Sequence, residues 1–267
     1  MRYFESYAGV AVGKEHRLAE RRKDILTVLE QEGQLSVLDL SARFEVSEVT
    51  IRQDLQALSE QGLLLRTRGR AVATSAMPEF SFDVRQQQYS TQKVHIGQAA
   101  ARLVNAGDTI ILDASTTAQA MIPYLKNLSE LTVITNGLKA AISLLDSPQI
   151  QVILPGGNLR RESISLIGRM QDDLLAGVNV QLGFFGARGL TLEEGLTDVN
   201  LNEVTMKAAM VARCRRVVGL VDSRKWGNVA AATFARLDQL DLLITDSDVP
   251  PEMLAQVRQQ QVEVVVV

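Results

Sequence analysis

Seven short apolar runs occur between residue 109 and the end of the sequence, and helical segments separate most of them. Several runs are apolar throughout instead of alternating with polar residues, which is typical of strands that helices cover on both faces. This order of strands and helices predicts a doubly wound, mainly parallel α/β sheet. The runs are residues 109–112, 131–134, 151–154, 182–185, 217–221, 242–245 and 262–267.

An earlier segment, residues 36–71, has the pattern of two short helices joined by a tight turn and followed by a hairpin. Ser36 lies three residues before Asp39, so each side chain can accept a hydrogen bond from a free backbone N–H at the start of a helix. Ser47 is a second N-cap, with Glu48 in the first turn, where the helix dipole favours an anion.

The second of these helices is expected to run to about Gln61 and to end at Gly62. Its apolar residues recur at the spacing of one buried face, so the polar residues between them point outward, where they can reach DNA. The buried positions are Ile51, Leu55 and Leu58, and the outward ones are Arg52, Gln53 and Gln56. Val49 is also outward and either contacts a thymine methyl group or seals the turn against the first helix.

Three arginines alternate after the second helix, at Arg66, Arg68 and Arg70. Alternate residues of a strand point to one face, so we expect the three to share a face of a hairpin whose tip is Gly69. Isolated surface arginines more often only keep a sheet edge soluble, but beside such a helix contact with phosphates or the minor groove is favoured. The segment predicts a winged helix-turn-helix that binds double-stranded DNA. Its candidate contacts are Ser36, Ser47, Glu48, Thr50, Arg52, Gln53, Gln56, Arg66, Arg68 and Arg70.

A length of 267 residues accommodates two domains that each bury a core. Residues 1–17 have no assignable role, residues 18–73 are the expected winged helix domain, 74–92 a linker and 93–267 the α/β domain. The net charge is −3, and acidic and basic residues balance within the first 75 positions. Because the chain has no overall positive charge, we expect DNA binding to depend on geometry and on duplicated sites in a homo-oligomer, a dimer or tetramer.

The single cysteine, Cys214, excludes an intrachain disulfide and favours a reducing compartment. No apolar run approaches the length of a membrane span, and the first residues lack the apolar core of a secretory signal. We therefore expect a cytoplasmic protein with no membrane partner. Two arginines flank Cys214 and can lower the pKa of its thiol, but a buried thiol on an amphipathic helix is the favoured interpretation.

Polar loops follow three of the apolar runs, at the strand ends where α/β sheets bind ligands. They offer a carboxylate, hydroxyls, an amide, glycines that allow close backbone approach and an arginine, all suited to a phosphate or a sugar hydroxyl. Each loop alone is an ordinary cap or turn, but three at equivalent strand ends favour a shared pocket. Their candidate residues are Asp113, Ser115, Thr116, Thr117, Thr135, Asn136, Gly156, Gly157 and Arg160.

Two further pairs of charged residues occur later in the chain. Glu203 and Lys207 lie four residues apart on an expected helix, a spacing that by itself indicates only an ion pair along that helix. Asp222 and Lys225 follow the run 217–221, so a lysine again lies just beyond a strand end.

From about Leu18 onward the chain resembles bacterial transcription regulators of the DeoR family. The resemblance rests on the segments VSEVTIRQDLQALSEQGLLLR, ILDASTT, ITNG, PGGNLRRESISLIG, GLTDVNLNEVTMKAAM and VDSRKWG, in this order. It implies a winged helix-turn-helix and a sensor domain similar to ribose-5-phosphate isomerase, in a repressor of a carbohydrate operon that releases DNA when a phosphorylated sugar binds. It assigns the effector to the loop residues named above, with Glu203, Lys207, Asp222 and Lys225 completing the wall.

The sequence departs from that family at several positions. Glu45 replaces the usual turn glycine, Ala114 and Arg70 replace frequent glycines, and Arg188 stands where an aspartate is common. If Glu45 is left-handed, strain of about 1–2 kcal/mol follows. Arg188 brings a positive charge close to the expected pocket, so the ligand is expected to differ from those of relatives with the aspartate.

Two other functions compete with an effector-responsive repressor. One is a sugar-phosphate isomerase with an appended DNA-binding domain, in which Glu203 and Lys207 supply acid–base chemistry. The chain has only two histidines, and no histidine triad, metal site or cofactor motif is apparent, so we expect no enzyme, metal or cofactor. The other is a DNA-binding protein that responds to no ligand, and phosphorylated sugars would leave its melting temperature unchanged.

Overall fold

The computed structural model describes residues 18, 20–29, 32, 34–60, 64–67, 70–72, 82–168 and 177–267. The chain divides into two compact units, residues 1–84 and 85–267. Helix α4 (Phe82–Gln87) and the start of helix α5 (Ser90–Ala101) lie in the range that the sequence indicated as linker. The later part of that range therefore belongs to the second unit. The expected extension, residues 1–17, lies outside the described residues.

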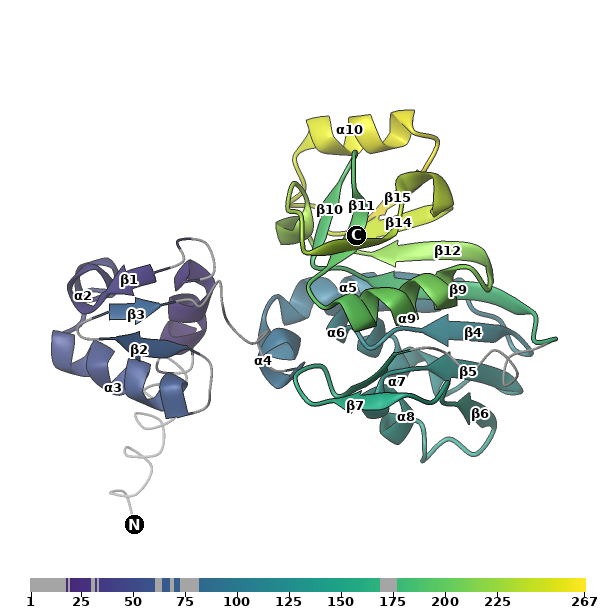
Figure 1. Cartoon of the computed structure of the whole chain (residues 1–267), viewed down its shortest axis with the longest axis horizontal. Helices are drawn as coiled ribbons and strands as arrows, with labels where there is room; N and C mark the ends of the chain where they lie inside the picture. Colours follow the sequence, from purple (N-terminus) through teal and green to yellow (C-terminus); the bar gives the residue numbers. More distant parts are fainter. Residues whose placement is uncertain are drawn as a thin grey trace, which may run out of the picture. The chain divides into compact units, whose positions relative to one another are not determined.

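The first unit is the expected winged helix-turn-helix, in which three helical segments pack on a small antiparallel sheet of order β1-β3-β2 (Figure 1). Ile25, Leu40 and Ile51, from the three helical segments, are 0% exposed and share one core. The elements are the helical residues 20–29, β1 (Gln34–Ser36), α2 (Val37–Phe44), α3 (Glu48–Glu60), β2 (Leu65–Thr67) and β3 (Arg70–Val72).

Helices α2 and α3 begin where their capping residues predict. Ser36 Oγ accepts the Asp39 N–H at 3.0 Å and Asp39 Oδ2 accepts the Ser36 N–H at 3.3 Å, which completes the capping box. Ser47 Oγ accepts the Thr50 N–H at 3.2 Å. The predicted buried face of α3 is confirmed, since Ile51, Leu55 and Leu58 are at most 2% exposed. The expected stop at Gly62 lies outside the described residues.

The backbone register of the hairpin corrects one prediction. Thr67 pairs with Arg70 and Arg66 pairs with Ala71. Residues directly opposite each other share a face, whereas neighbours along a strand alternate, so positions 66 and 70 belong to opposite faces. The prediction of one shared arginine face is wrong for these two positions, because the hairpin turn interrupts the alternation. Arg68 and Gly69 lie outside the described residues.

The second unit is built on a seven-stranded sheet of order β15-β14-β12-β9-β4-β5-β6, in which every neighbouring pair is parallel (Figure 1). Each of the seven apolar runs predicted from the sequence forms one of these strands. The strands are β4 (Thr109–Leu112), β5 (Leu131–Thr135), β6 (Ile150–Ile153), β9 (Val180–Gly186), β12 (Cys214–Leu220), β14 (Leu242–Thr245) and β15 (Glu263–Val266).

Helices cover both faces of this sheet, as the doubly wound pattern predicts (Figure 1). Leu112 of β4 packs in one core with residues of α5 to α8, whereas its neighbour Ile111 packs in the other core with residues of α9 and α10. This two-sided burial explains why the strands are apolar throughout. The covering helices are α5, α6 (Thr116–Gln119), α7 (Ile122–Leu125), α8 (Leu138–Ser143), α9 (Leu201–Val211) and α10 (Pro251–Gln259).

The strand order reverses between β4 and β9. The chain proceeds outward from β4 through β5 to β6, then returns to β9 on the other side of β4 and continues to β15. In open α/β sheets such a switch point leaves a crevice at the carboxyl ends of the two strands. Asp113 and Gly186 stand at those two ends, and the Gly186 N–H donates to Asp113 Oδ2 at 2.9 Å.

Two smaller sheets, which the apolar pattern did not predict, border the main one. They comprise the hairpin β7 (Asn158–Arg160) and β8 (Ser165–Ile167), and the sheet of β10 (Gly189–Thr191), β11 (Gly195–Asp198) and β13 (Ala232–Ala235). Single 3₁₀ turns span Ser223–Lys225 and Leu237–Gln239. No helix within the described ranges has the length and apolar character to cross a membrane.

Cys214 begins strand β12, so its predicted place on a helix is wrong. Its Sγ donates to the carbonyl of Met210 at 3.2 Å. Burial raises the pKa of the thiol to about 12, so the sulfur stays protonated at neutral pH.

Candidate functional sites

Helix α3 presents the outward polar face that the sequence predicts. Arg52, Gln53 and Gln56 are exposed, and Val49 is 60% exposed, so Val49 does not seal the turn against α2. The hydroxyls of Ser47 and Thr50 bond to each other at 2.9 Å, which ties both to the cap of the helix. Arg52 Nη2 donates to Glu48 Oε2 at 2.6 Å, one turn earlier on α3.

A buried carboxylate that sequence reasoning missed fixes α3 to the preceding helical residues. Asp54 is 1% exposed, and its two oxygens accept from Arg21 Nε at 2.7 Å and Arg22 Nε at 2.8 Å. The signal was available, because Asp54 occupies a position between Ile51 and Leu55 on the apolar face of α3. The predicted wing contacts at 66 and 70 are known only as backbone positions in β2 and β3.

The second candidate site lies at the switch point of the main sheet, around Lys207 of α9. Its Nζ is 2.9 Å from the Gly186 carbonyl, 2.6 Å from Asp198 Oδ2 and 3.0 Å from Asp113 Oδ2. Burial alone would lower the pKa of Lys207, but the carboxylates of Asp113, Asp198 and Glu203 outweigh it and raise the pKa above its ordinary value. All three N–H donors of the ammonium thus face protein acceptors, so Lys207 supports the rim and has no donor left for a ligand.

The four-residue spacing suggested an ion pair between Glu203 and Lys207, but the principal partners of Glu203 lie elsewhere. It accepts from Ser165 Oγ at 2.7 Å and forms an ion pair with Arg160 Nη1 at 2.8 Å, so it joins α9 to the β7–β8 hairpin. Burial would raise the pKa of Asp198, but Lys207 and then Arg188 hold it below its ordinary value. The cluster therefore balances three carboxylates against three cations. The carboxylates are those of Asp113, Asp198 and Glu203, and the cations are Lys207, Arg160 and Arg188.

The predicted loop residues gather at the same rim, where several already have protein partners. Ser115 Oγ accepts the Ala118 N–H at 3.1 Å as the cap of α6, and Thr135 Oγ1 accepts the Gly137 N–H at 3.0 Å. A Cβ on Gly157 would lie 2.5 Å from the Ile167 carbonyl, so that glycine permits the β7–β8 hairpin. Asn136 is 0% exposed, and its Oδ1 lacks a hydrogen-bond partner in the described part of the chain.

Ser115 and Lys207 both lie close to one glycine, Gly186. A Cβ on Gly186 would lie 2.4 Å from Ser115 Oγ, and the carbonyl of the same glycine accepts from Lys207. Only a residue without a side chain fits between the α6 loop and the Lys207 cluster.

Asp222 and Lys225 belong to a separate group on the α5 side of the sheet. The guanidinium of Arg224 donates to Asp222 at 3.0 and 3.3 Å and lies 3.7 Å above the ring of Tyr89. Burial would raise the pKa of Asp222, but Lys225 and Arg224 hold it below its ordinary value.

The same group contains Lys93, a buried lysine of α5 that sequence reasoning did not single out. Lys93 is 5% exposed, and its Nζ donates to the carbonyls of Arg85 and, at 2.8 Å, Gln88. Burial lowers the pKa of Lys93 to about 7, because Asp222 only partly offsets the loss of hydration while Arg224 and Lys225 add repulsion. The available signal was a lysine at the helical spacing of the small and apolar residues Ile96 and Ala100, which form the covered side of α5.

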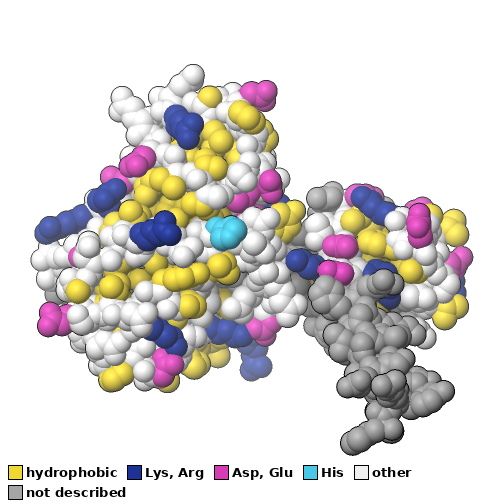
Figure 2. Space-filling model, turned by 180° about the vertical axis from the view of Figure 1, so that it is seen from behind, with side chains coloured by type: hydrophobic (Ala, Val, Ile, Leu, Met, Phe, Trp, Pro, Cys, Tyr) yellow, Lys and Arg dark blue, Asp and Glu magenta, His cyan; other side chains and the backbone are white. Residues whose placement is uncertain are grey.

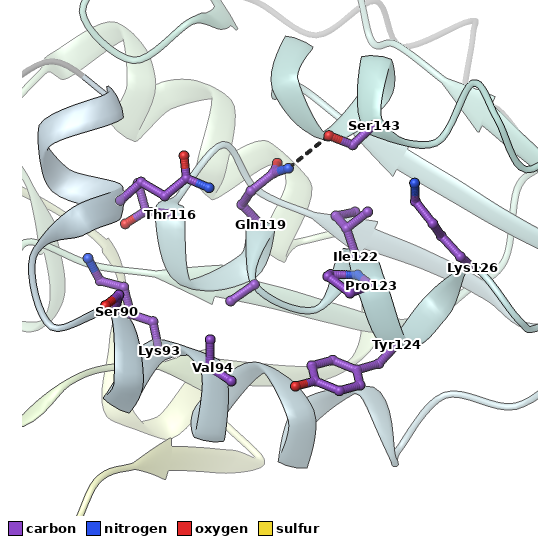
Figure 3. Close-up of a pocket in the computed structure, with 12 residues that line it drawn as sticks. Ser90, Lys93, Val94, Thr116, Gln119, Ile122, Pro123, Tyr124, Lys126 and Ser143 are labelled. Carbon is purple, nitrogen blue, oxygen red and sulfur yellow. Dashed lines mark hydrogen bonds between the residues drawn. The ribbon is translucent and has the colours of Figure 1, made fainter. Parts of the chain in front are cut away.

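Lys93 lines a pocket of about 360 Å³, a volume within the range of small-molecule sites. In Figure 3, Lys93 and Val94 of α5 lie across the pocket from Thr116 and Gln119 of α6. Gln119 Nε2 donates to Ser143 Oγ of α8 at 3.1 Å along the pocket wall (Figure 3). The pocket thus combines an apolar floor, hydroxyl and amide groups and a cation that titrates near neutral pH.

The face of the molecule shown in Figure 2 is mixed in charge. On the face shown in Figure 2, basic side chains stand apart among acidic and uncharged ones. This agrees with the net charge of −3 and with DNA contact that depends on local geometry.

Two family models match the chain. The model described as "DeoR-like helix-turn-helix domain" matches residues 21–76, and the one described as "DeoR C terminal sensor domain" matches residues 88–247. Together they match most of both units and include all of the site residues predicted from the sequence.

Curated relatives align with this chain over most of their length. The HTH-type transcriptional regulator GolR of Listeria innocua is 40% identical over 231 residues, which are 86% of this chain and 91% of GolR. The glycerol-3-phosphate regulon repressor of Escherichia coli K12 is 31% identical over 238 residues, 89% of this chain and 94% of that repressor. A solved ribose 5-phosphate isomerase from Methanocaldococcus jannaschii shares 19% identity over 51% of this chain and 54% of its own, with a TM-score of 0.39, too low to support an inference.

Proposed function

The chain belongs to the DeoR family of DNA-binding transcriptional regulators, and we propose that it represses a carbohydrate catabolic operon and releases the operator when a phosphorylated sugar binds. One relative, the glycerol-3-phosphate regulon repressor, is named after a phosphate ester, and this supports an effector of that chemical class. We place the effector at the carboxyl ends of the sheet and the operator on α3 and the hairpin.

The observation that carries the proposal is the buried ammonium of Lys93 in the pocket that Thr116 also lines. Burying a cation costs free energy unless a partner compensates, and Asp222 compensates only in part. A phosphate dianion beside Lys93 and Lys225 would supply the missing negative charge. The Thr116 hydroxyl would add a hydrogen bond to it.

The sugar portion is assigned to the switch-point crevice. Asn136 Oδ1 is a buried acceptor that a sugar hydroxyl would satisfy. We propose that Arg160, Glu203 and Asp113, which form ion pairs near the same strand ends, line the crevice with it. Lys207 is reassigned from effector contact to support of this rim, because its N–H groups are already occupied.

Binding at this position would reach the DNA-binding unit through the first residues of the second unit. Lys93 holds the carbonyls of Arg85 and Gln88, and Arg224 stacks on Tyr89, so both cations fasten residues 85–89. These residues directly follow the first unit in the chain. A phosphate that draws on the N–H groups of Lys93 would loosen them, which gives reciprocal coupling between effector and operator. We further propose that a homo-oligomer presents paired winged helices to a repeated operator.

The test uses the full-length protein and a duplex that it selects from a random DNA library. Operator affinity is measured by fluorescence anisotropy with a set of phosphorylated sugars and their unphosphorylated parents. We expect at least one phosphorylated sugar, but not its parent, to weaken binding about tenfold or more. Lys93→Met should blunt the response, whereas Lys126→Met, a control on the same pocket, should retain it.

Two results would contradict the proposal. If no phosphorylated sugar changes either operator affinity or melting temperature, the protein does not respond to this effector class. If NMR shows conversion of a phosphorylated sugar by the purified protein, the alternative of an isomerase with an appended DNA-binding domain is supported instead.

A further inference from the structure

The exposed part of α3 contains an ion pair that fold stability does not explain. The side chains of Arg52 and Glu48 are 55% and 41% exposed, yet Arg52 Nη2 lies 2.6 Å from Glu48 Oε2. An exposed pair four residues apart contributes little to the stability of a helix, because solvent screens it and both side chains lose freedom. Its main effect is to fix the direction of the guanidinium.

A fixed guanidinium at this place has a specific chemical use. The first turns of a recognition helix contact base edges in the major groove. A guanidinium has five N–H donors, and one bond to Glu48 leaves enough for the bidentate pair that matches O6 and N7 of guanine. Neither adenine, cytosine nor thymine offers two acceptors in that arrangement.

The neighbouring side chains narrow the assignment. Ser47 and Thr50 bond to each other through their hydroxyls, which ties both side chains to the N-cap of α3. Val49 lies three residues before Arg52, on the same side of the helix, and exposes 60% of its surface. An apolar side chain exposed beside a base-contacting arginine suits the methyl group of a thymine.

We infer that Arg52 contacts a guanine in each operator half-site, that Glu48 is the positioning residue that orients it, and that Val49 contacts the methyl of a thymine beside that guanine. This inference rests on the proposed function, since it requires α3 to enter the major groove. It adds the bases recognised and assigns a separate role to each of the three residues.

The experiment is selection of duplexes from a random library by the full-length protein and by single variants, followed by affinity measurements on the selected site. Arg52→Ala should lose the preference for guanine at one position of each half-site and bind about tenfold or more weakly, with the other positions unchanged. Glu48→Gln should keep guanine as the favoured base but reduce its margin over the other three. Val49→Ala should lose the thymine preference at the neighbouring position only.

A matched control is available on α2, where Arg43 forms an exposed ion pair with Glu32. Arg43→Ala removes an arginine of the same kind and should leave every base preference unchanged. If Arg52→Ala selects the same motif as the parent protein, the inference is wrong while the proposed function stands. If the parent protein selects no motif at all, both are overturned. Circular dichroism of each variant checks that the exposed substitutions leave the fold intact.

Discussion

Glu45 holds a backbone conformation that suits glycine. It is the C-cap of α2, with φ 52° and ψ 39°, and its N–H donates to the Ser41 carbonyl. A side chain in this left-handed region costs about 1–2 kcal/mol, because Cβ approaches the neighbouring carbonyl. The turn of the helix-turn-helix therefore carries the strain expected from the sequence.

Replacing Glu45 by glycine should relieve that strain. Glu45→Gly is expected to stabilise the DNA-binding unit by about 1 kcal/mol, since part of the gain is offset by the greater freedom of glycine in the unfolded chain. Differential scanning calorimetry of the full-length protein measures it as a higher melting temperature of the first unit. Glu45→Ala keeps a Cβ and serves as the control. Equal melting temperatures for Glu45→Gly and Glu45→Ala would show that the left-handed residue carries no strain.

Lys93 should make effector binding depend on pH. Its pKa is about 7 without a ligand, and a phosphate beside it favours the charged form, so binding above pH 7 must take up a proton. Effector affinity is then expected to fall by up to about tenfold per pH unit above neutrality. Calorimetry at pH 8 in buffers of different ionisation enthalpy should show uptake of close to one proton per effector. Zero uptake by the parent protein would remove Lys93 from the phosphate site.

The same shift has a defined sign for stability. The folded-state pKa of Lys93 lies below its ordinary value of 10.5, so between pH 7 and that value the unfolded chain binds a proton that the folded chain does not. This lysine alone therefore makes stability rise with pH across that window.

At the level of secondary structure, the sequence predicted the strands that are buried on both faces of the main sheet. The runs 109–112 and 242–245 coincide with β4 and β14, because a strand between two helical layers must be apolar along its whole length. The β7–β8 and β10–β11 hairpins have no such signal, since each strand is three or four residues long and mixes polar with apolar side chains. The prediction that the arginines of the wing share one face was wrong because the alternation of faces along a strand does not continue through the hairpin turn.

Contacts in the candidate sites could be predicted only where a side chain and its hydrogen-bond or ion-pair partner are close in the sequence. The caps at Ser36, Ser47 and Ser115 are local and were found. Spacing along α9 pointed to a Glu203–Lys207 pair, but Asp113, nearly a hundred residues earlier, binds Lys207, and Arg160 binds Glu203. Such partners depend on strand order, which composition and periodicity do not encode.

Docking of α3 on the preceding helical residues depends on Asp54. Asp54→Asn keeps the shape but removes the charge that compensates Arg21 and Arg22, and breaking a buried ion pair on one side typically costs about 3–5 kcal/mol. Because both arginines are partly exposed, we expect a loss near 3 kcal/mol for the first unit. The fluorescence of Trp226, the only tryptophan, reports the second unit and should be unchanged. Asp24→Asn, at an exposed position in the same helical segment, is the control. A calorimetric loss no larger than that of Asp24→Asn would mean that Asp54 does not hold α3.

At the scale of the whole molecule, a repressor needs its two binding events to oppose each other, and the fastening of residues 85–89 is the place where the proposed coupling is accessible to mutation. Tyr89→Leu keeps an apolar side chain but removes the ring that Arg224 stacks on, a contact worth about 0.5–2 kcal/mol. Tyr89 itself is not one of the residues that line the pocket. Effector affinity in the absence of DNA should therefore stay near that of the parent protein, while the factor by which effector weakens operator binding should fall at least about threefold.

Thermodynamic reciprocity between the two binding sites adds a second requirement to this prediction. If effector weakens operator binding by a smaller factor in Tyr89→Leu, then operator DNA must weaken effector binding by the same smaller factor. Titrating effector calorimetrically with and without saturating operator, and operator by anisotropy with and without effector, closes the cycle. Tyr124→Leu is the matched control, because Tyr124 lines the pocket on α7, whereas the ring on which Arg224 stacks is that of Tyr89. An unchanged coupling factor in Tyr89→Leu would show that the signal leaves the sensor by another route, and the fastening of residues 85–89 would then be purely structural.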